Sequence, residues 1–274
     1  MSKHSPQHLK AIARRGPRPK QQPKSVPASK LPRQISAEDR AWVTSMIVWQ
    51  DDFVMGFNKP SNLSSQGGRG PDSHNLDDLM WAFVKPSGRR PMLIHRLDRD
   101  TSGIILAAKT HPATSYLGKA MIRRAFAKTY LAIVSNPHNL PDRVTLDAPL
   151  RREEIGREAW SRVCDPDHPD AQAATTHFEV LSRNDEAALV RCQPVTGRMH
   201  QIRVHLAHLG APIAGDVRYG GALSLGGAAV PRLMLHARSL TFPHPEHGND
   251  MTLSAPVPAD MQTVCARLEL KLPD

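Results

Sequence analysis

Apolar residues of this chain fall mainly into short runs, separated by stretches rich in glycine, proline, asparagine and aspartate. Short β-branched and aliphatic runs between such turn-forming residues predict β-strands. The runs with this character span residues 53–58, 92–94, 103–108, 128–134, 175–181, 187–193, 234–242 and 251–254. The pattern therefore favours a fold that is rich in β-structure.

Apolar spacings of three and four residues predict helices in four further segments. These segments span residues 76–83, 113–124, 198–209 and 259–268. Strands and helices do not alternate regularly, as a doubly wound parallel sheet would require. We therefore expect an α+β fold in a single domain, with a mixed, largely antiparallel sheet and flanking helices.

The first 36 residues differ in composition from the rest of the chain. They contain six prolines, nine Lys and Arg residues, no Asp or Glu, and almost no aliphatic periodicity. Such a segment buries too little apolar surface to offset the loss of chain entropy on folding. We expect residues 1–36 to form a disordered basic tail and residues 37–274 to form the folded domain, with a helix that starts at Ser36.

The formal net charge of +10 points to a polyanionic partner such as nucleic acid. Nearly all of this excess lies in residues 1–36, which leaves 27 basic and 26 acidic residues for the folded domain. A basic surface on that domain requires its charges to be segregated in space. The tail, in contrast, is basic by composition alone.

The three cysteines are far apart and form no C-x-x-C pair, which favours a reducing compartment over a disulfide framework. The N-terminus has no apolar signal region, and no stretch of about 18 apolar residues occurs. We expect a cytoplasmic protein that neither enters nor crosses a membrane. The Arg-rich start without acidic residues also fits an organelle transit peptide.

A polar segment from His95 to Gly103 separates two apolar runs and contains Arg96, Asp98 and Asp100. It cannot continue either strand, so we expect a loop at the edge of a sheet, where binding and catalytic groups are often presented. In the alternative interpretation, Asp98 or Asp100 accepts backbone N–H bonds in an ordinary connection.

A second polar segment coincides with the helix predicted over residues 198–209. Thr196 is a candidate N-cap and Gly210 a candidate C-terminal residue, and Ile202, Leu206 and Leu209 form an apolar stripe. The remaining side chains make the helix rich in hydrogen-bond donors; they are Arg198, His200, Gln201, Arg203 and His208.

The histidines of this helix argue against a metal site. His200, His205 and His208 are spaced by five and three residues, and no H-E-x-x-H motif occurs. Phosphate-binding and dinucleotide-binding glycine motifs are also missing, so we expect no metal and no cofactor. Tyr130, one of three tyrosines, lies in a predicted strand, where a core position is the ordinary interpretation.

Several of these segments match, in chain order, the motifs of one enzyme family. The matching residues are Asn58-Lys59-Pro60, His95-Arg96-Leu97-Asp98 through Thr101-Ser102-Gly103, Lys128-Thr129-Tyr130, Thr196-Gly197-Arg198, His200-Gln201-Ile202-Arg203, His205-Leu206, Gly215-Asp216, Tyr219-Gly220, Leu235-His236-Ala237, Leu240, Phe242 and His244-Pro245. Over residues 50–258 the chain resembles the RluA-type pseudouridine synthases. Asn62 stands where the first motif usually has glycine, and residues 64–77 have no clear counterpart.

The resemblance implies an enzyme that isomerises uridines in structured ribosomal or transfer RNA without a cofactor or metal. Asp98 would be the carboxylate next to C1′ of the ribose, acting either as a nucleophile on C1′ or as a base on the 2′ proton. A buried carboxylate needs a neighbouring cation, and Arg203 is our candidate. Tyr130 would stack near the uracil and take the C5 proton.

The target base must leave its stack before it can react. Arg96 has the length and the planar head to occupy the vacated place, and we expect His95, Arg198, His200 and Gln201 to contact RNA. We also expect a monomer. Two other classes remain open at this point, a non-catalytic RNA-binding protein and a metal-dependent RNA hydrolase.

Overall fold

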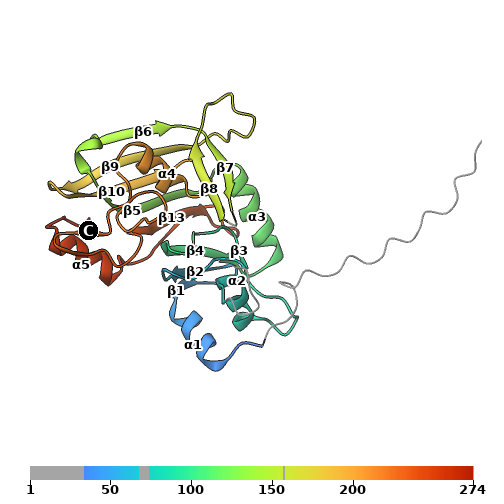
Figure 1. Ribbon diagram of the computed structural model, residues 1–274. Helices are drawn as coiled ribbons and strands as arrows, with labels where there is room; N and C mark the ends of the chain where they lie inside the picture. Colours follow the sequence, from blue (N-terminus) through green and yellow to red (C-terminus); the bar gives the residue numbers. More distant parts are fainter. Residues whose placement is uncertain (1–33, 68–73, 157, 274) are drawn as a thin grey trace, which may run out of the picture. The chain divides into compact units, whose positions relative to one another are not determined.

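The computed structural model describes residues 34–67, 74–156 and 158–273. Its main feature is a ten-stranded mixed sheet (Figure 1). The strands are β1 (Ile47–Gln50), β2 (Val54–Lys59), β3 (Met92–Leu93), β4 (Ser102–Ala108), β5 (Ala127–Ser135), β6 (Arg143–Asp147), β9 (Thr175–Arg183), β10 (Ala187–Pro194), β13 (Leu235–Pro243) and β14 (Asp250–Ser254). The main order is β1-β2-β4-β13-β5-β10-β9-β6; in addition, β3 pairs with β4 and β14 with β13.

One pairing in this sheet, β4 with β13, is parallel, and the other pairings between its described strands are antiparallel. This arrangement confirms the predicted α+β class. At the parallel pairing, Gly103 lies opposite Ala237, and Ala237 lies opposite Tyr130 of β5. Gly103 has φ +116°, and a Cβ there would lie 2.2 Å from the carbonyl oxygen of Ala237. Only glycine permits this close approach of the two strands.

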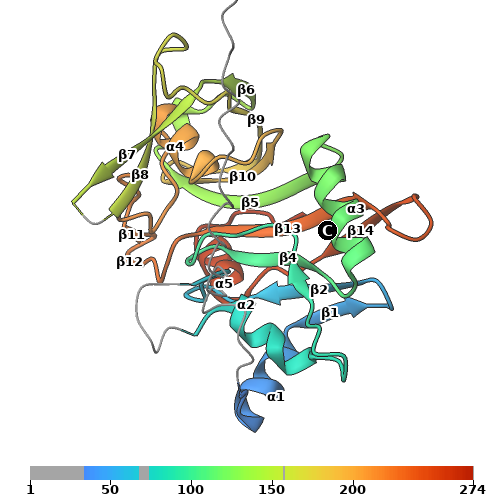
Figure 2. The same cartoon turned by 90° about the vertical axis from the view of Figure 1, so that its right-hand side faces the viewer.

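Two small ribbons lie beside the main sheet. The first joins β7 (Leu150–Ile155) to β8 (Glu158–Val163), and the second joins β11 (Ser224–Leu225) to β12 (Ala228–Ala229). Figure 2 shows the β7–β8 ribbon next to α4 (Gln201–His208). Its base packs there in a small apolar cluster that includes Leu150 and Val204.

The remaining helices cover two halves of the sheet. They are α1 (Ala37–Ser45), α2 (Leu76–Leu79) with the 3-10 helix η2 (Met80–Phe83), α3 (His111–Ile122), the 3-10 helix η3 (Pro137–Asn139) and α5 (Ala259–Arg267). Apolar side chains of α1, α2 and α3 form one core with β2 and β4, and those of α4 and α5 form a second core with β5 and β10. Tyr130 packs against both cores, so it marks where they meet.

The eight predicted strands and four predicted helices are present in the described chain, with shifted ends. The helix predicted from residue 198 begins at Gln201, and the helix predicted over 76–83 is an α-helical turn followed by a 3-10 turn. The strands that were not predicted are β1, β6, β7, β8, β11 and β12. The β7–β8 ribbon is rich in charged residues and has no apolar face along its length, so its sequence carries no strand signal.

The predicted helix start at Ser36 is confirmed, because Ser36 is the N-cap of α1 and its hydroxyl accepts the Asp39 N–H at 3.0 Å. Residues 1–33 of the predicted tail lie outside the described residues. Among the described helices, the longest has 12 residues, and none combines the length and hydropathy needed to cross a membrane.

Candidate active site

A cavity of about 670 Å³ opens where the two cores meet. It is lined by the loop before β4, by β5, by the loop before α4 and by the C-terminal end of α3. Its volume lies within the range of about 300–1,000 Å³ that is usual for ligand pockets. The cavity contains Asp98, Tyr130 and Arg203, the three residues predicted to be catalytic. The fold therefore brings together residues that are far apart in the sequence.

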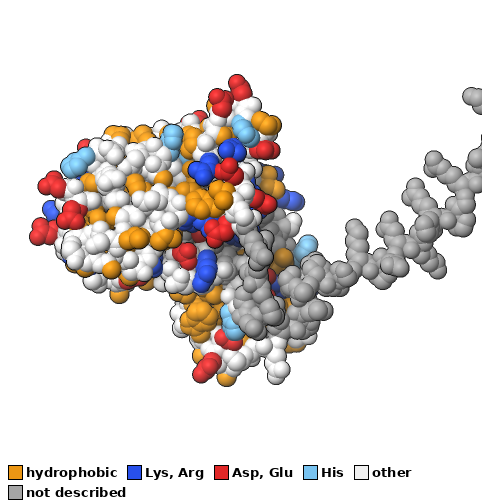
Figure 3. Space-filling model, viewed as in Figure 1, with side chains coloured by type: hydrophobic (Ala, Val, Ile, Leu, Met, Phe, Trp, Pro, Cys, Tyr) orange, Lys and Arg blue, Asp and Glu red, His pale blue; other side chains and the backbone are white. Residues whose placement is uncertain are grey.

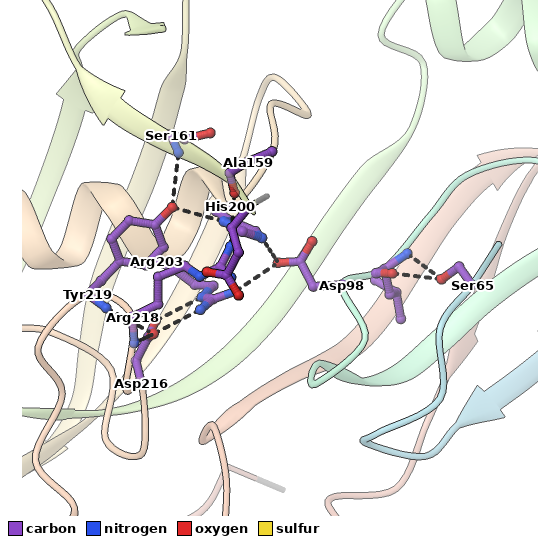
Figure 4. Close-up of polar contacts among 11 residues, drawn as sticks. Ser65, Asp98, Ala159, Ser161, His200, Arg203, Asp216, Arg218 and Tyr219 are labelled. Atoms are coloured by element: carbon purple, nitrogen blue, oxygen red, sulfur yellow. Dashed lines mark hydrogen bonds and ion pairs between the residues drawn. The ribbon is translucent and has the colours of Figure 1, made fainter. Parts of the chain in front are cut away.

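The loop that carries Asp98 is fixed through its backbone. Ser65 Oγ donates to the carbonyl of Leu97 at 2.7 Å and accepts the Leu97 N–H at 3.0 Å (Figure 4). On the other side, Ser61 Oγ donates to the carbonyl of Asp100 at 2.9 Å. Asp98 thus lies between two anchored residues. Ser65 belongs to a segment without a recognisable motif, so its role was not predicted.

Lys59 anchors the same loop from inside the protein. Its side chain is fully buried, and Nζ donates to the carbonyls of Pro60, Leu63 and Arg99 at 2.8, 2.8 and 3.1 Å. Burial lowers the pKa of Lys59 to about 7, although Asp98 and Asp100 oppose this shift. Three carbonyl acceptors require three N–H donors, which only the protonated ammonium offers. Lys59 therefore supports the loop that carries Asp98, and its burial shields it from substrate.

Arg203 lies between two carboxylates. Its Nη1 is 3.7 Å from Asp98 Oδ2, so the ion pair expected from the sequence is present. Its Nε and Nη2 form two shorter bonds of 2.8 Å to the carboxylate oxygens of Asp216. Asp216 is buried, whereas the Asp98 side chain is 31% exposed. Asp216 thus fixes the guanidinium, and Asp98 keeps an accessible carboxylate beside it.

His200 and Tyr219 form a second support for Asp98. His200 Nε2 is 4.0 Å from Asp98 Oδ2, and its Nδ1 is 2.9 Å from the Tyr219 hydroxyl, which accepts the Ser161 N–H at 3.1 Å. Figure 4 shows His200 and Arg203 pointing toward Asp98 from the same side. Burial lowers the pKa of His200, which favours a neutral ring. When Tyr219 donates to Nδ1, the ring carries its proton on Nε2, toward Asp98.

The loop before α4 differs from its predicted structure. His200, with φ +55°, is the N-cap of α4, and Thr196 is not. Thr196 instead donates to Gln201 Oε1, which also accepts the Arg198 N–H. Gln201 Nε2 donates to the Thr175 carbonyl and to Thr176 Oγ1. These bonds use both ends of a buried amide, so Gln201 shapes the loop, and the RNA contact predicted for it stays a prediction.

Tyr130 lies in the cavity, and its hydroxyl has no hydrogen-bond partner among the described residues. Burial raises the pKa of Tyr130, and the negative charge of Asp98 raises it further. The side chain is therefore a neutral phenol at neutral pH. A neutral phenol is a weak base, and the role expected for Tyr130 in taking the C5 proton stays a prediction.

The other predicted RNA-contacting residues have different surroundings. Arg96 is exposed, lines the cavity and has no partner in the described chain. His95 Nε2 accepts the Leu106 N–H at 3.2 Å, which occupies this ring nitrogen. Burial lowers the pKa of His95 to about 3, so the ring is neutral. Arg198 Nε donates to the Ala173 carbonyl, which leaves the outer guanidinium nitrogens at the cavity wall.

The cavity wall is basic, although the folded domain is nearly neutral. Its ionic residues are Arg96, Asp98, Arg124, Lys128, Arg198 and Arg203, of which one is acidic. On the face drawn in Figure 3, in contrast, basic and acidic side chains are mixed over the β7–β8 ribbon. Segregation into the cavity is what a polyanionic ligand requires. Four further residues of the site were not predicted, although three of them lie within the matched motifs; they are Arg124, Lys128, Asp216 and Tyr219.

Two of the three histidines predicted on this helix, His200 and His205, have protein partners. His205 is buried, with Nδ1 2.9 Å from Thr176 Oγ1 and Nε2 3.0 Å from the Ala148 carbonyl oxygen. Burial lowers the pKa of His205, as expected for a core histidine. His200 faces Asp98 and Tyr219, as described above. These contacts give both residues a role that needs no metal.

Comparisons with known proteins agree with this geometry. Residues 54–208 match the model of a protein family described as RNA pseudouridylate synthase. The chain is 34% identical over 247 residues to ribosomal large subunit pseudouridine synthase C of Haemophilus ducreyi, covering 89% of this chain and 75% of that protein. The Escherichia coli K12 protein of the same name is 36% identical over 234 residues, covering 83% and 71%. The structure of human RNA pseudouridylate synthase domain containing 4 superposes with a TM-score of 0.72 and 26% identity, covering 86% of this chain and 99% of that one.

Proposed function

Because this chain belongs to the RNA pseudouridylate synthase family, we propose that it isomerises uridine in ribosomal RNA with Asp98 as the reacting carboxylate. The relatives at 34–36% identity are named for the ribosomal large subunit, which supports this RNA over transfer RNA. The observation that carries the proposal is the accessible Asp98 carboxylate, held 3.7 Å from Arg203 in a basic cavity.

The reaction breaks the N1–C1′ bond of uridine, turns the uracil and forms a C5–C1′ bond, with no net change in atoms or oxidation state. Asp98 would act on the ribose by one of two routes, attack on C1′ or removal of the 2′ proton. Arg203 stabilises the negative charge of this carboxylate, and Asp216 holds Arg203 in place. Tyr130 would stack on the uracil, and Arg96 would fill the place that the flipped base leaves.

Substitution Asp98→Asn tests the proposal, since asparagine has the same shape and no charge. We expect pseudouridine formation to fall by at least about a thousandfold. RNA affinity should change little, because phosphate contacts supply most of it. Asp100→Asn, two residues away on the same loop, is the matched control and should stay active. Pseudouridine formation by the Asp98→Asn protein at the normal rate would disprove the assignment.

The non-catalytic alternative is not favoured by the family membership. It predicts that the wild-type protein binds RNA but leaves its uridines unchanged, which mass spectrometry of treated RNA would detect. Action on ribosomal RNA is also consistent with the cytoplasmic location expected from the sequence. The monomeric state stays a prediction that sedimentation can test.

A further inference from the structure

Lys128 is a basic residue of the cavity to which the reaction described above assigns no role. It lies on β5 two residues before Tyr130, and residues two apart on a strand share a face. Both side chains line the cavity. Nζ of Lys128 lies 3.6 Å from the position that a Cβ on Gly197 would take. The ammonium therefore reaches the loop before α4 at the point where this loop has no side chain.

The ammonium of Lys128 has no protein partner. No hydrogen bond or ion pair joins it to any residue of the described chain. Burial lowers the pKa of Lys128, and its charge in turn helps to lower the pKa of the neighbouring His95. Lys128 is partly buried, and partial burial of a cation without an acidic partner lowers the stability of a protein. A charged group that is present although it lowers the stability of the fold is a candidate for ligand binding.

The surroundings of Lys128 favour an anion near the cavity mouth. Gly197 is exposed, and Arg198 follows it at the cavity wall. An RNA phosphate beside the mouth suits this position better than the reacting base.

Building on the proposed function, we propose that Lys128 binds a backbone phosphate of the substrate RNA adjacent to the flipped uridine. Gly197 leaves the space open for this phosphate, and Arg198 lies next to it. A phosphate held here would fix the backbone while the base occupies the space between Asp98 and Tyr130. Lys128 would then contribute to RNA affinity and to the position of the RNA backbone in the site. It would not take part in the chemical step.

The test compares Lys128→Met with the wild-type protein on a ribosomal RNA stem-loop. We expect the Kd to rise about tenfold, because one charge-assisted contact is lost. The slope of log Kd against log salt should fall by about 1. The single-turnover rate at saturating RNA should stay within about twofold. The melting temperature of the RNA-free protein should not fall, since an unpaired, partly buried charge has been removed.

Three results would overturn this inference. An unchanged Kd and salt slope would mean that Lys128 does not touch a phosphate. A lower rate at saturating RNA with an unchanged Kd would place Lys128 at the departing uracil instead. A melting temperature lowered by more than about 4 °C would indicate a structural role. Lys271→Met is the matched control, because Lys271 is exposed and does not line the cavity, and it should match the wild type.

Failure of this inference can be distinguished from failure of the proposed function. If the wild-type protein forms no pseudouridine, the proposed function fails, whatever the Lys128 substitution does to binding. If the wild-type protein is active and Lys128→Met binds RNA with normal affinity and salt dependence, only the phosphate contact is disproved. Lys128→Arg should retain the salt slope, since arginine also binds phosphate.

Discussion

Arg203 makes its two short bonds to Asp216 and lies 3.7 Å from Asp98. Asp216, the more buried carboxylate, therefore orients the guanidinium. Asp98, the more exposed carboxylate, is stabilised by the positive charge of that guanidinium. This division explains how a buried arginine can serve an accessible acid without closing over it. Asp216 is a positioning residue, and its substitution should affect stability and activity together.

Asp216→Asn tests this relationship. The substitution leaves a buried guanidinium without its charged partner, so we expect the free energy of unfolding to fall by about 3 kcal/mol. The saturating rate should fall by about tenfold, since Arg203 loses its orientation relative to Asp98. Urea unfolding and single-turnover kinetics measure the two effects.

Asp260→Asn provides the control for Asp216→Asn. Asp260 pairs with Arg232, but its side chain is 38% exposed, so the loss should be at most about 1 kcal/mol. The saturating rate should not change, because neither residue lines the cavity. Equal effects of the two substitutions would contradict the role of Asp216.

Arg96→Ala tests base flipping. Arg96 is exposed at the cavity and unpaired in the described chain, so it is free to enter the RNA stack. We expect the rate to fall about 10- to 100-fold for a uridine inside a stem and much less for one in a bulge, which is already unstacked. Arg99→Ala, on the same exposed loop, should affect both substrates little. Equal losses on stem and bulge would remove the flipping role.

Stability should depend on pH through His236. This ring is fully buried; Ser102 Oγ is 3.0 Å from Nδ1 and the Ala255 carbonyl oxygen 3.4 Å from Nε2, and burial lowers its pKa to about 4. In the unfolded chain the His236 side chain has a pKa near 6.5, so it binds a proton more readily than in the folded protein. The stabilising contribution is therefore complete above pH 6.5 and is lost as the pH falls to 4, a change of about 3 kcal/mol.

Urea unfolding between pH 4 and 8 measures this effect. His236→Gln should be less stable at pH 7 and should lose less stability on acidification than the wild type, with a slope smaller by about 1.4 kcal/mol per pH unit below pH 6.5. His111→Gln, at an exposed position, should keep the wild-type slope. Parallel curves for His236→Gln and the wild type would contradict the assignment.

Removal of residues 1–33 tests the basic N-terminal segment. This deletion takes away nine basic residues and keeps Ser36, which caps α1. RNA binding should weaken by about tenfold or more, and its salt dependence should become shallower, because fewer counterions are released. The rate at saturating RNA should be unchanged. An unaltered salt slope would show that the segment does not contact RNA.

The fold class and eight of the strands could be predicted from the sequence, because short apolar runs specify strands locally. The polar segment around Asp98 fits an ordinary connection as well as a site, so the role expected for Asp98 came from the family resemblance. Strands such as β7 and β8 escaped prediction because charged residues form a ribbon only when a partner strand supplies the hydrogen bonds.

The role of each polar side chain, in contrast, depends on the folded structure. Gln201 and Arg203 lie two residues apart on α4 and have similar polar character, yet one holds a loop and the other faces Asp98. Their partners come from β9 and from the loop before β4, far away in the sequence. The roles depend on burial and on which distant groups lie within hydrogen-bond distance, and these relations exist only after the chain has folded.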